Sequence, residues 1–104
     1  MLDIIAEPSR QRILELVWER EVSAGEIAAQ FPTSFGAVSQ HLAILREAGL
    51  VSVRREGRHQ FYRARQEQLG PLARYLETLW AGKLGRLKAL AEFEEAPPKR
   101  RREQ

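Results

Sequence analysis

The chain has 104 residues, a formal net charge of +3 and no cysteine. This length predicts a single domain, and the lack of cysteine excludes disulfides, thiolate metal sites and cysteine nucleophiles. No apolar run approaches the ~20 residues of a membrane-spanning helix, and the first residues lack the apolar stretch of a secretion signal. We therefore expect a cytoplasmic protein without a membrane partner.

Positive charge is concentrated in two segments. Residues 1–45 carry three arginines against six acidic residues, whereas residues 46–65 carry six arginines against two glutamates. Residues 97–104 carry four basic residues against one glutamate. A local basic stripe is typical of a protein that binds a phosphate backbone. The alternative is a solvated hairpin rich in arginine.

The first part of the chain is predicted to be helical. Residues 2–6 begin the first helix or form a short turn before it, and Pro8 suits the first turn of a helix. This helix is expected to continue to about Arg20. Its apolar face is formed by Ile13, Leu14 and Val17.

A second, shorter helix is predicted to begin at Ser23. Ser23 and Glu26 have the spacing of a capping box, in which each side chain binds the backbone amide of the other residue. The inner side of this helix is expected to be Ile27, Ala28 and Phe31, and Pro32 ends it.

Residues 34–51 predict one short helix with two different faces. Ser34 can cap its first free amides, and Gly49 can adopt the left-handed conformation that ends a helix. The residues expected to face the core are Val38, Leu42 and Leu45. Two short helices joined by a tight turn make a helix-turn-helix, and the free face of the second helix suits a DNA major groove.

Residues 51–64 are predicted to form a two-stranded hairpin. Gly57 favours the turn, and arginines lie at the tip. A lone hairpin is only marginally stable, so it must pack on the helices. We expect this packing to involve Val51, Val53 and either Phe61 or Tyr62.

Residues 66–93 are predicted to form one long helix with a wide apolar band. One interpretation is a helix that packs on its own domain. We favour a dimer seam shared with residues 2–18 of a second copy, because two-fold pairs are the commonest oligomers. The expected interface residues are Leu2, Ile5, Leu72, Leu76, Leu79, Trp80, Leu84 and Leu87.

The predicted fold is mainly α with a small β-hairpin: a winged helix-turn-helix with a long C-terminal dimerisation helix. It occupies residues 1–96, and residues 97–104 are expected to be a disordered basic tail. The chain resembles the ArsR-type bacterial winged-helix repressors over about residues 3–93. The matching stretches are 6–10, 12–14, 26–28, 38–42, 45–51 and 55–58, together with Tyr62.

This resemblance implies a homodimer that binds a two-fold symmetric operator and represses nearby genes. Some members sense metals through cysteines, or through Asp, His and Glu on the last helix. Here residues 66–93 contain neither His nor Asp, and His41 and His59 lack ligand-spaced partners. We expect no metal and no cofactor, and we leave open a small-molecule or protein inducer. Trp80 could line such an inducer site or belong to the core.

The candidate DNA contacts lie on the second helix of the helix-turn-helix and on the hairpin. Ser39 and Gln40 are expected to read base edges. Ser34, and Thr33 before it, are expected to hydrogen-bond phosphate. The hairpin arginines are expected to meet phosphates or a narrow minor groove, whereas Glu56 is expected to brace an arginine in the turn. The whole predicted set is Thr33, Ser34, Phe35, Gly36, Ser39, Gln40, His41, Arg54, Arg55 and Arg58.

Two of these side chains have alternative interpretations. Phe35 either touches a thymine methyl or packs inward, and His41 either contacts a phosphate or makes a supporting hydrogen bond. For the chain as a whole, an enzyme is disfavoured because no Ser/His/Asp set, phosphate-binding glycine loop or paired carboxylate motif occurs. The other rival is a protein–protein interaction module with a basic docking surface.

Overall fold

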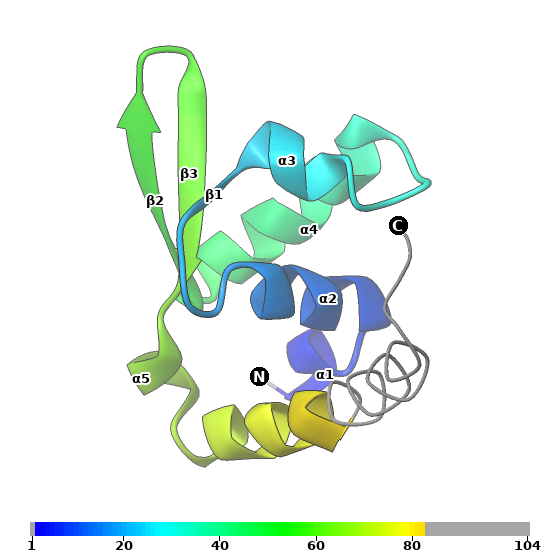
Figure 1. Cartoon of the computed structure of the whole chain (residues 1–104), viewed down its shortest axis with the longest axis vertical. Coiled ribbons are helices and arrows are strands. Elements are labelled where there is room, and N and C mark those ends of the chain that lie inside the picture. Colours follow the sequence, from blue (N-terminus) through cyan, green and yellow to red (C-terminus); the bar gives the residue numbers. More distant parts are fainter. Residues whose placement is uncertain (1, 83–104) are drawn as a thin grey trace, which may run out of the picture. The chain divides into compact units, whose positions relative to one another are not determined.

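The computed structural model describes residues 2–82 of the chain. Residues up to Gly70 form one compact unit, and a second unit begins at Pro71. The elements of the first unit are α1 (Leu2–Ile5), α2 (Pro8–Leu16), β1 (Val22–Ser23), α3 (Ala24–Ala28), α4 (Phe35–Glu47), β2 (Val51–Glu56), β3 (His59–Ala64) and α5 (Gln66–Leu69), as labelled in Figure 1.

Helix α2 starts where Pro8 predicted but ends before the expected Arg20. The Glu7 carboxylate caps it by accepting hydrogen bonds from the amides of Ser9 and Arg10. The helix stops at Leu16 because the backbone carbonyl of Val17 turns aside to accept a hydrogen bond of 2.9 Å from the Ala64 amide. A tertiary hydrogen bond thus replaces further helical hydrogen bonds.

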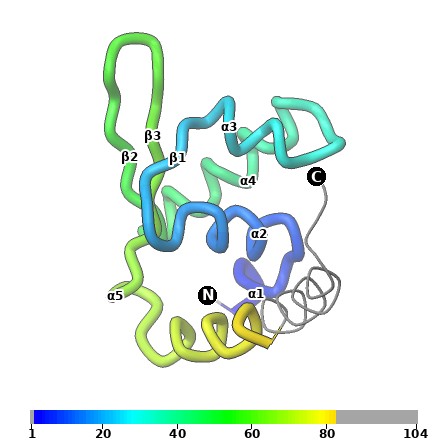
Figure 2. Tube along the Cα trace, in the orientation of Figure 1, coloured from blue at the N-terminus to red at the C-terminus, as the bar shows by residue number. Residues whose placement is uncertain are grey.

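The helix-turn-helix is formed by α3 and α4, which Figure 2 shows joined by a loop, residues 29–34. The predicted capping box is present: the Glu26 amide donates to Ser23 Oγ over 3.1 Å, and the Ser23 amide donates to Glu26 Oε1 over 3.3 Å. Helix α4 ends at Gly49, whose φ is 78°. The Leu50 amide then binds the Leu45 carbonyl over 3.0 Å, as in a Schellman motif.

The sheet has three antiparallel strands in the order β1-β3-β2. The two-stranded prediction missed β1, because two residues are too few to produce an alternating pattern. Val22, Tyr62 and Val53 lie side by side across the three strands. Tyr62 is the aromatic residue that packs inward, with 6 % of its surface exposed. The hairpin of β2 and β3 projects beyond the helices as a wing (Figure 1).

The core of the first unit lies where α2 and α3 pack against α4. Each fully buried aliphatic side chain contributes about 1.5–3 kcal/mol relative to exposure. The largest of these side chains in this unit are Ile13, Leu14, Ile27, Leu45 and Leu50. The positions predicted from helical spacing in α2 and α4 are therefore confirmed as core.

The predicted continuous helix over residues 66–93 is interrupted. Helix α5 ends at Gly70, which has φ 57° and ψ −133°, and a new helix covers residues 71–82. Pro71 explains the break, because it lacks an amide hydrogen and disfavours helical geometry in the preceding residue. Pro71 then starts the second helix, a position in which proline is well tolerated. The remainder of the predicted helix and the basic tail lie outside the described residues. The fold class is nevertheless confirmed as a mainly helical winged helix-turn-helix.

Candidate nucleic-acid interface

Helix α4 has one buried face and one exposed face. Val38, Leu42 and Leu45 are at most 2 % exposed, and they hold the helix from behind. Gly36 and Gln40, one turn apart on the other side, are exposed, whereas Ser39 is half-buried. A helix supported in this way fits a major groove about 12 Å wide.

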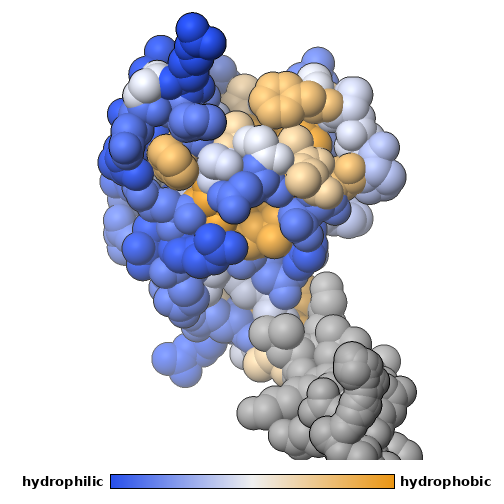
Figure 3. Space-filling view, turned by 45° about the horizontal axis from the view of Figure 1, so that its top comes forward, coloured by the Kyte–Doolittle hydropathy of each residue, from blue (hydrophilic) through white to orange (hydrophobic). Residues whose placement is uncertain are grey.

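The N-terminal end of α4 is also exposed. Ser34 Oγ accepts a hydrogen bond of 3.1 Å from the Ala37 amide, and a hydroxyl that accepts can still donate to another group. Thr33 precedes it on the surface. Phe35 is 56 % exposed, so its ring points outward and does not pack inward. Figure 3 shows hydrophobic side chains on this side of the molecule, bordered by hydrophilic ones.

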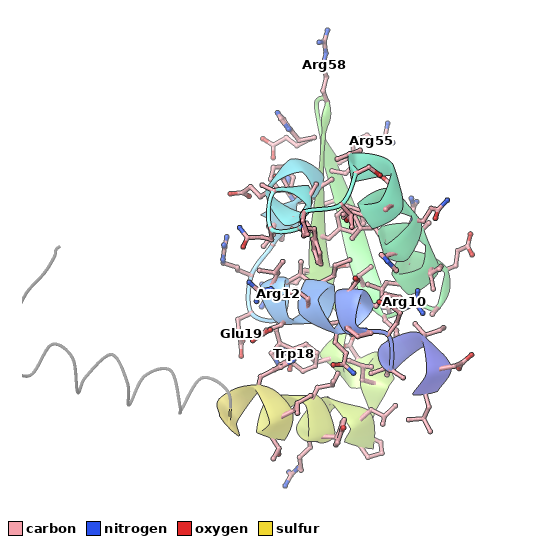
Figure 4. All side chains as sticks on the ribbon, turned by 90° about the vertical axis from the view of Figure 1, so that its right-hand side faces the viewer. Arg10, Arg12, Trp18, Glu19, Arg55 and Arg58 are labelled. Carbon is pink, nitrogen blue, oxygen red and sulfur yellow. The ribbon has the colours of Figure 1, made fainter. Side chains whose placement is uncertain are left out.

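The wing carries two arginines that point into open space. Arg55 lies near the end of β2 and Arg58 lies in the turn, and both are exposed. Figure 4 shows Arg58 extending from the tip of the hairpin. Within residues 2–82, neither guanidinium forms an ion pair with a carboxylate. Both charges are therefore available to an external anion.

Arg54 has a different environment from Arg55 and Arg58. Its guanidinium donates hydrogen bonds to Glu21 over 2.9 to 3.1 Å and to Glu56 over 2.6 Å. It also lies 4.8 Å from the centre of the Phe61 ring. The hydrogen bond from Arg54 lowers the pKa of Glu21 below its ordinary value, and the same contacts raise the pKa of Arg54. Glu56 therefore braces an arginine as predicted, but that arginine is Arg54 of strand β2 and does not lie in the turn.

His41 forms a hydrogen bond within the protein, which is one of the two roles that the sequence left open for it. Its Nδ1 lies 3.1 Å from a terminal guanidinium nitrogen of Arg10. The same guanidinium donates through Nε to the Ile4 carbonyl over 2.8 Å. Sequence reasoning missed Arg10, because no spacing rule connects residues that lie 31 positions apart.

The predicted dimer residues divide into exposed and buried groups. Leu2 is 68 % exposed and Leu79 is 37 % exposed, whereas Ile5, Leu76 and Trp80 are at most 5 % exposed in the single chain. Leu72 is half-buried, and Leu84 and Leu87 lie outside the described residues. Tyr75, 58 % exposed and one turn before Leu79, was not predicted. An i, i+4 search for large apolar side chains next to Leu79 would have found it.

The described part of the chain offers neither a metal site nor a membrane span. Among residues 2–82, no three His, Cys, Asp or Glu side chains gather into a group that could hold a metal ion. None of the helices described there is both long and apolar enough to cross a bilayer.

Comparison with known proteins identifies the family. The sequence model described as "Bacterial regulatory protein, arsR family" matches residues 7–53. The chain is 36 % identical over 81 residues to the biofilm growth-associated repressor of Agrobacterium fabrum, covering 78 % of this chain and 67 % of that protein. It is 34 % identical over 80 residues to the transcriptional activator HlyU of Vibrio cholerae, covering 77 % and 74 % respectively.

The fold comparison agrees with the sequence comparison. The crystal structure of a "possible transcriptional regulator for arsenical resistance" is 41 % identical and superimposes with a TM-score of 0.65, covering 85 % of this chain and 92 % of that one. The relatives are regulators of transcription and not enzymes. The chain therefore belongs to the ArsR family of bacterial regulatory proteins, and it is a DNA-binding regulator of transcription.

Proposed function

We propose that two copies of this chain bind an inverted-repeat operator and repress the genes beside it. The observation that carries this proposal is the pairing of an outward helix with a basic wing. Helix α4 exposes Gln40, and the wing carries Arg55 and Arg58 without acidic partners among residues 2–82. Base reading and phosphate binding need these two kinds of surface.

In this proposal, α4 reads sequence and the wing supplies affinity. The Gln40 amide can form a bidentate pair with adenine, which is worth about 1–3 kcal/mol of discrimination. Ser39 lies beside it, and the outward Phe35 is placed to touch a thymine methyl, with Gly36 allowing close approach. Thr33 and Ser34 donate to phosphates at the positive end of the helix. Arg55 and Arg58 meet phosphates or the minor groove.

Arg54 acts differently from the other wing arginines in this proposal. Its contacts with Glu21 and Glu56 already use its guanidinium. We assign it to bracing the wing through the Phe61 ring, so that Arg55 and Arg58 are held in position. Its contribution to DNA binding is therefore indirect.

The proposed dimer uses exposed apolar side chains near both ends of the described chain. Leu2, Tyr75 and Leu79 are large apolar residues that remain exposed in the single copy. Two-fold pairing would present two α4 helices to half-sites about one helical turn apart. Repression follows if the occupied operator blocks access to the promoter.

We expect the proposed repressor to work in the cytoplasm without a bound metal, because residues 66–93 contain neither His nor Asp. If an inducer exists, it is a small molecule or a second protein. Zinc at micromolar concentration is expected to leave DNA binding unchanged at constant ionic strength.

Selection of bound duplexes from a random pool at physiological salt tests the proposal. We expect enrichment of an inverted repeat, and light scattering should give twice the mass of one chain. Recovery of single half-sites would contradict the dimer. Equal recovery of all sequences would contradict specific regulation and would favour a protein-docking role for the α4 face.

A further inference from the structure

Arg10 connects three helices through one side chain. Its Nε donates to the Ile4 carbonyl in α1 over 2.8 Å, and a terminal nitrogen reaches Nδ1 of His41 in α4 over 3.1 Å. Its own backbone amide donates to the Glu7 carboxylate that caps α2. Figure 4 shows Arg10 at the start of α2, between α1 and α4.

The chemistry of this contact fixes which group donates. A guanidinium has only hydrogen-bond donors, so Nδ1 of His41 is the acceptor in this contact. Arg10 therefore donates to α1 and to α4 at the same time, and these hydrogen bonds hold both helices to the start of α2.

Two charged groups at the start of α2 face His41. Arg10 donates the hydrogen bond to its ring, and the Glu7 carboxylate interacts with the ring electrostatically. Glu26 of α3 is engaged in the capping box with Ser23, and Arg54 of β2 is held by two carboxylates.

The position of His41 makes this contact relevant to DNA. His41 directly follows Ser39 and Gln40, which carry base reading in the proposed function. A binding site must hold its groups within about 0.5 Å and 10–20° of the productive geometry. The hydrogen bond to His41 restrains rotation of α4 about its axis. Without this restraint, such a rotation would move the Gln40 side chain across the major groove.

We propose that Arg10 is a positioning residue for DNA recognition, and that it sets the orientation of α4 through its hydrogen bond to His41. The inference rests on the proposed DNA-binding function. It adds that sequence discrimination depends on a residue that does not itself touch DNA.

The test compares the ratio of affinities for the selected duplex and for a scrambled duplex, measured by fluorescence anisotropy. The variants are Arg10→Ala and His41→Leu, which remove the donor and the acceptor. Arg12→Ala is the matched control, because Arg12 lies on the same helix and forms its ion pair with Glu15 of that helix. This control removes the same charge and leaves the hydrogen bond from Arg10 to His41 in place.

We expect Arg10→Ala and His41→Leu each to lower the ratio about tenfold, which corresponds to about 1.4 kcal/mol, and the double variant to add little more. Arg12→Ala should leave the ratio unchanged. If Arg10→Ala behaves like Arg12→Ala, the inference is wrong although specific binding stands. If the wild-type protein shows no preferred duplex, the proposed function itself fails. Should Arg10→Ala unfold, His41→Leu decides the question.

A conservative variant separates positioning from a general loss of stability. His41→Asn keeps an uncharged acceptor near the Nδ1 position, so it should retain the wild-type ratio, whereas His41→Leu should not. A ratio for His41→Asn as low as that for His41→Leu would overturn the role of the Arg10 hydrogen bond.

Discussion

The guanidinium of Arg54 donates hydrogen bonds of 2.9 to 3.1 Å to the carboxylate of Glu21, which lies 33 residues earlier in the chain. This pair connects the segment before β1 to the far strand of the wing. It engages Arg54 in ion pairs within the protein, while Arg55 and Arg58 remain exposed to solvent. The adjacent arginines of β2 thus have different surroundings.

Replacing the wing arginines one at a time should separate their roles. Arg58→Ala and Arg55→Ala should weaken binding to every duplex and reduce the slope of log affinity against log salt by about 0.9 for each phosphate that is no longer neutralised. Arg54→Ala should leave the slope nearly unchanged. Salt titrations of duplex binding make the measurement, and a slope change with Arg54→Ala equal to that of Arg58→Ala would assign Arg54 to the DNA.

Acid should weaken the Glu21–Arg54 brace. The hydrogen bond from Arg54 lowers the pKa of Glu21 below its ordinary value of 4.5. The unfolded chain therefore binds more protons than the folded protein just below this value, and the contribution of Glu21 to stability, present above pH 4.5, disappears as the pH falls through the depressed pKa.

Denaturant unfolding of wild-type protein and Glu21→Gln between about pH 3 and pH 6 checks this linkage. The variant should show a shallower fall in the free energy of unfolding at acid pH. Glu19→Gln, an exposed position in the same connecting segment, should keep the wild-type slope. Identical profiles for Glu21→Gln and wild type would show that the Glu21–Arg54 ion pair does not contribute to the free energy of unfolding.

Gln40→Ala should relax sequence preference at one base pair of each half-site. The bidentate contact with adenine is worth about 1–3 kcal/mol, so the selected duplex should bind about five- to 150-fold more weakly for each half-site that loses the contact. Binding to a scrambled duplex should change little, because phosphate contacts are retained. A uniform loss on all sequences would contradict base reading by Gln40.

Gly49→Ala should destabilise the fold by about 1–2 kcal/mol, because an alanine must adopt a left-handed conformation there. The φ of Gly49 is 78°, and no atom lies within 4 Å of the place a Cβ would take. The cost is therefore confined to the backbone. Gly25→Ala is the matched control: it has the same open space but a helical setting, and it should stabilise by about 0.5–1 kcal/mol. Thermal unfolding of both variants makes the comparison, and equal effects would reject the helix-end explanation.

Much of the fold follows from short-range patterns in the sequence. The Ser23–Glu26 capping box, the Ser34 cap and the Gly49 stop each involve residues within a few positions of one another. The buried positions of α4 recur at helical spacing. Such interactions are formed by the local chain, so their residue types reveal them before any tertiary structure is known.

The errors occur where distant residues compete with local preferences. Helix α2 stops early because the Val17 carbonyl binds Ala64, and β1 exists because two residues pair with Tyr62 and Phe61. The break at Gly70 was readable in part, since Pro71 marks a helix start. The prediction of one continuous helix followed the apolar band of residues 66–93 and not the signal from Pro71.

By itself, the sequence determined the order of the helices and the wing, the caps of α3 and α4, the core face of α4 and the resemblance to a family of regulators. These features depend on neighbours three or four positions apart, whose chemistry is visible in the letters. Only the tertiary structure decided that Arg54 is braced while Arg55 and Arg58 are exposed, and that Arg10 holds His41. Those pairs lie 31 to 33 residues apart, and a charged side chain chooses its partner from whatever the packed core brings within hydrogen-bonding distance.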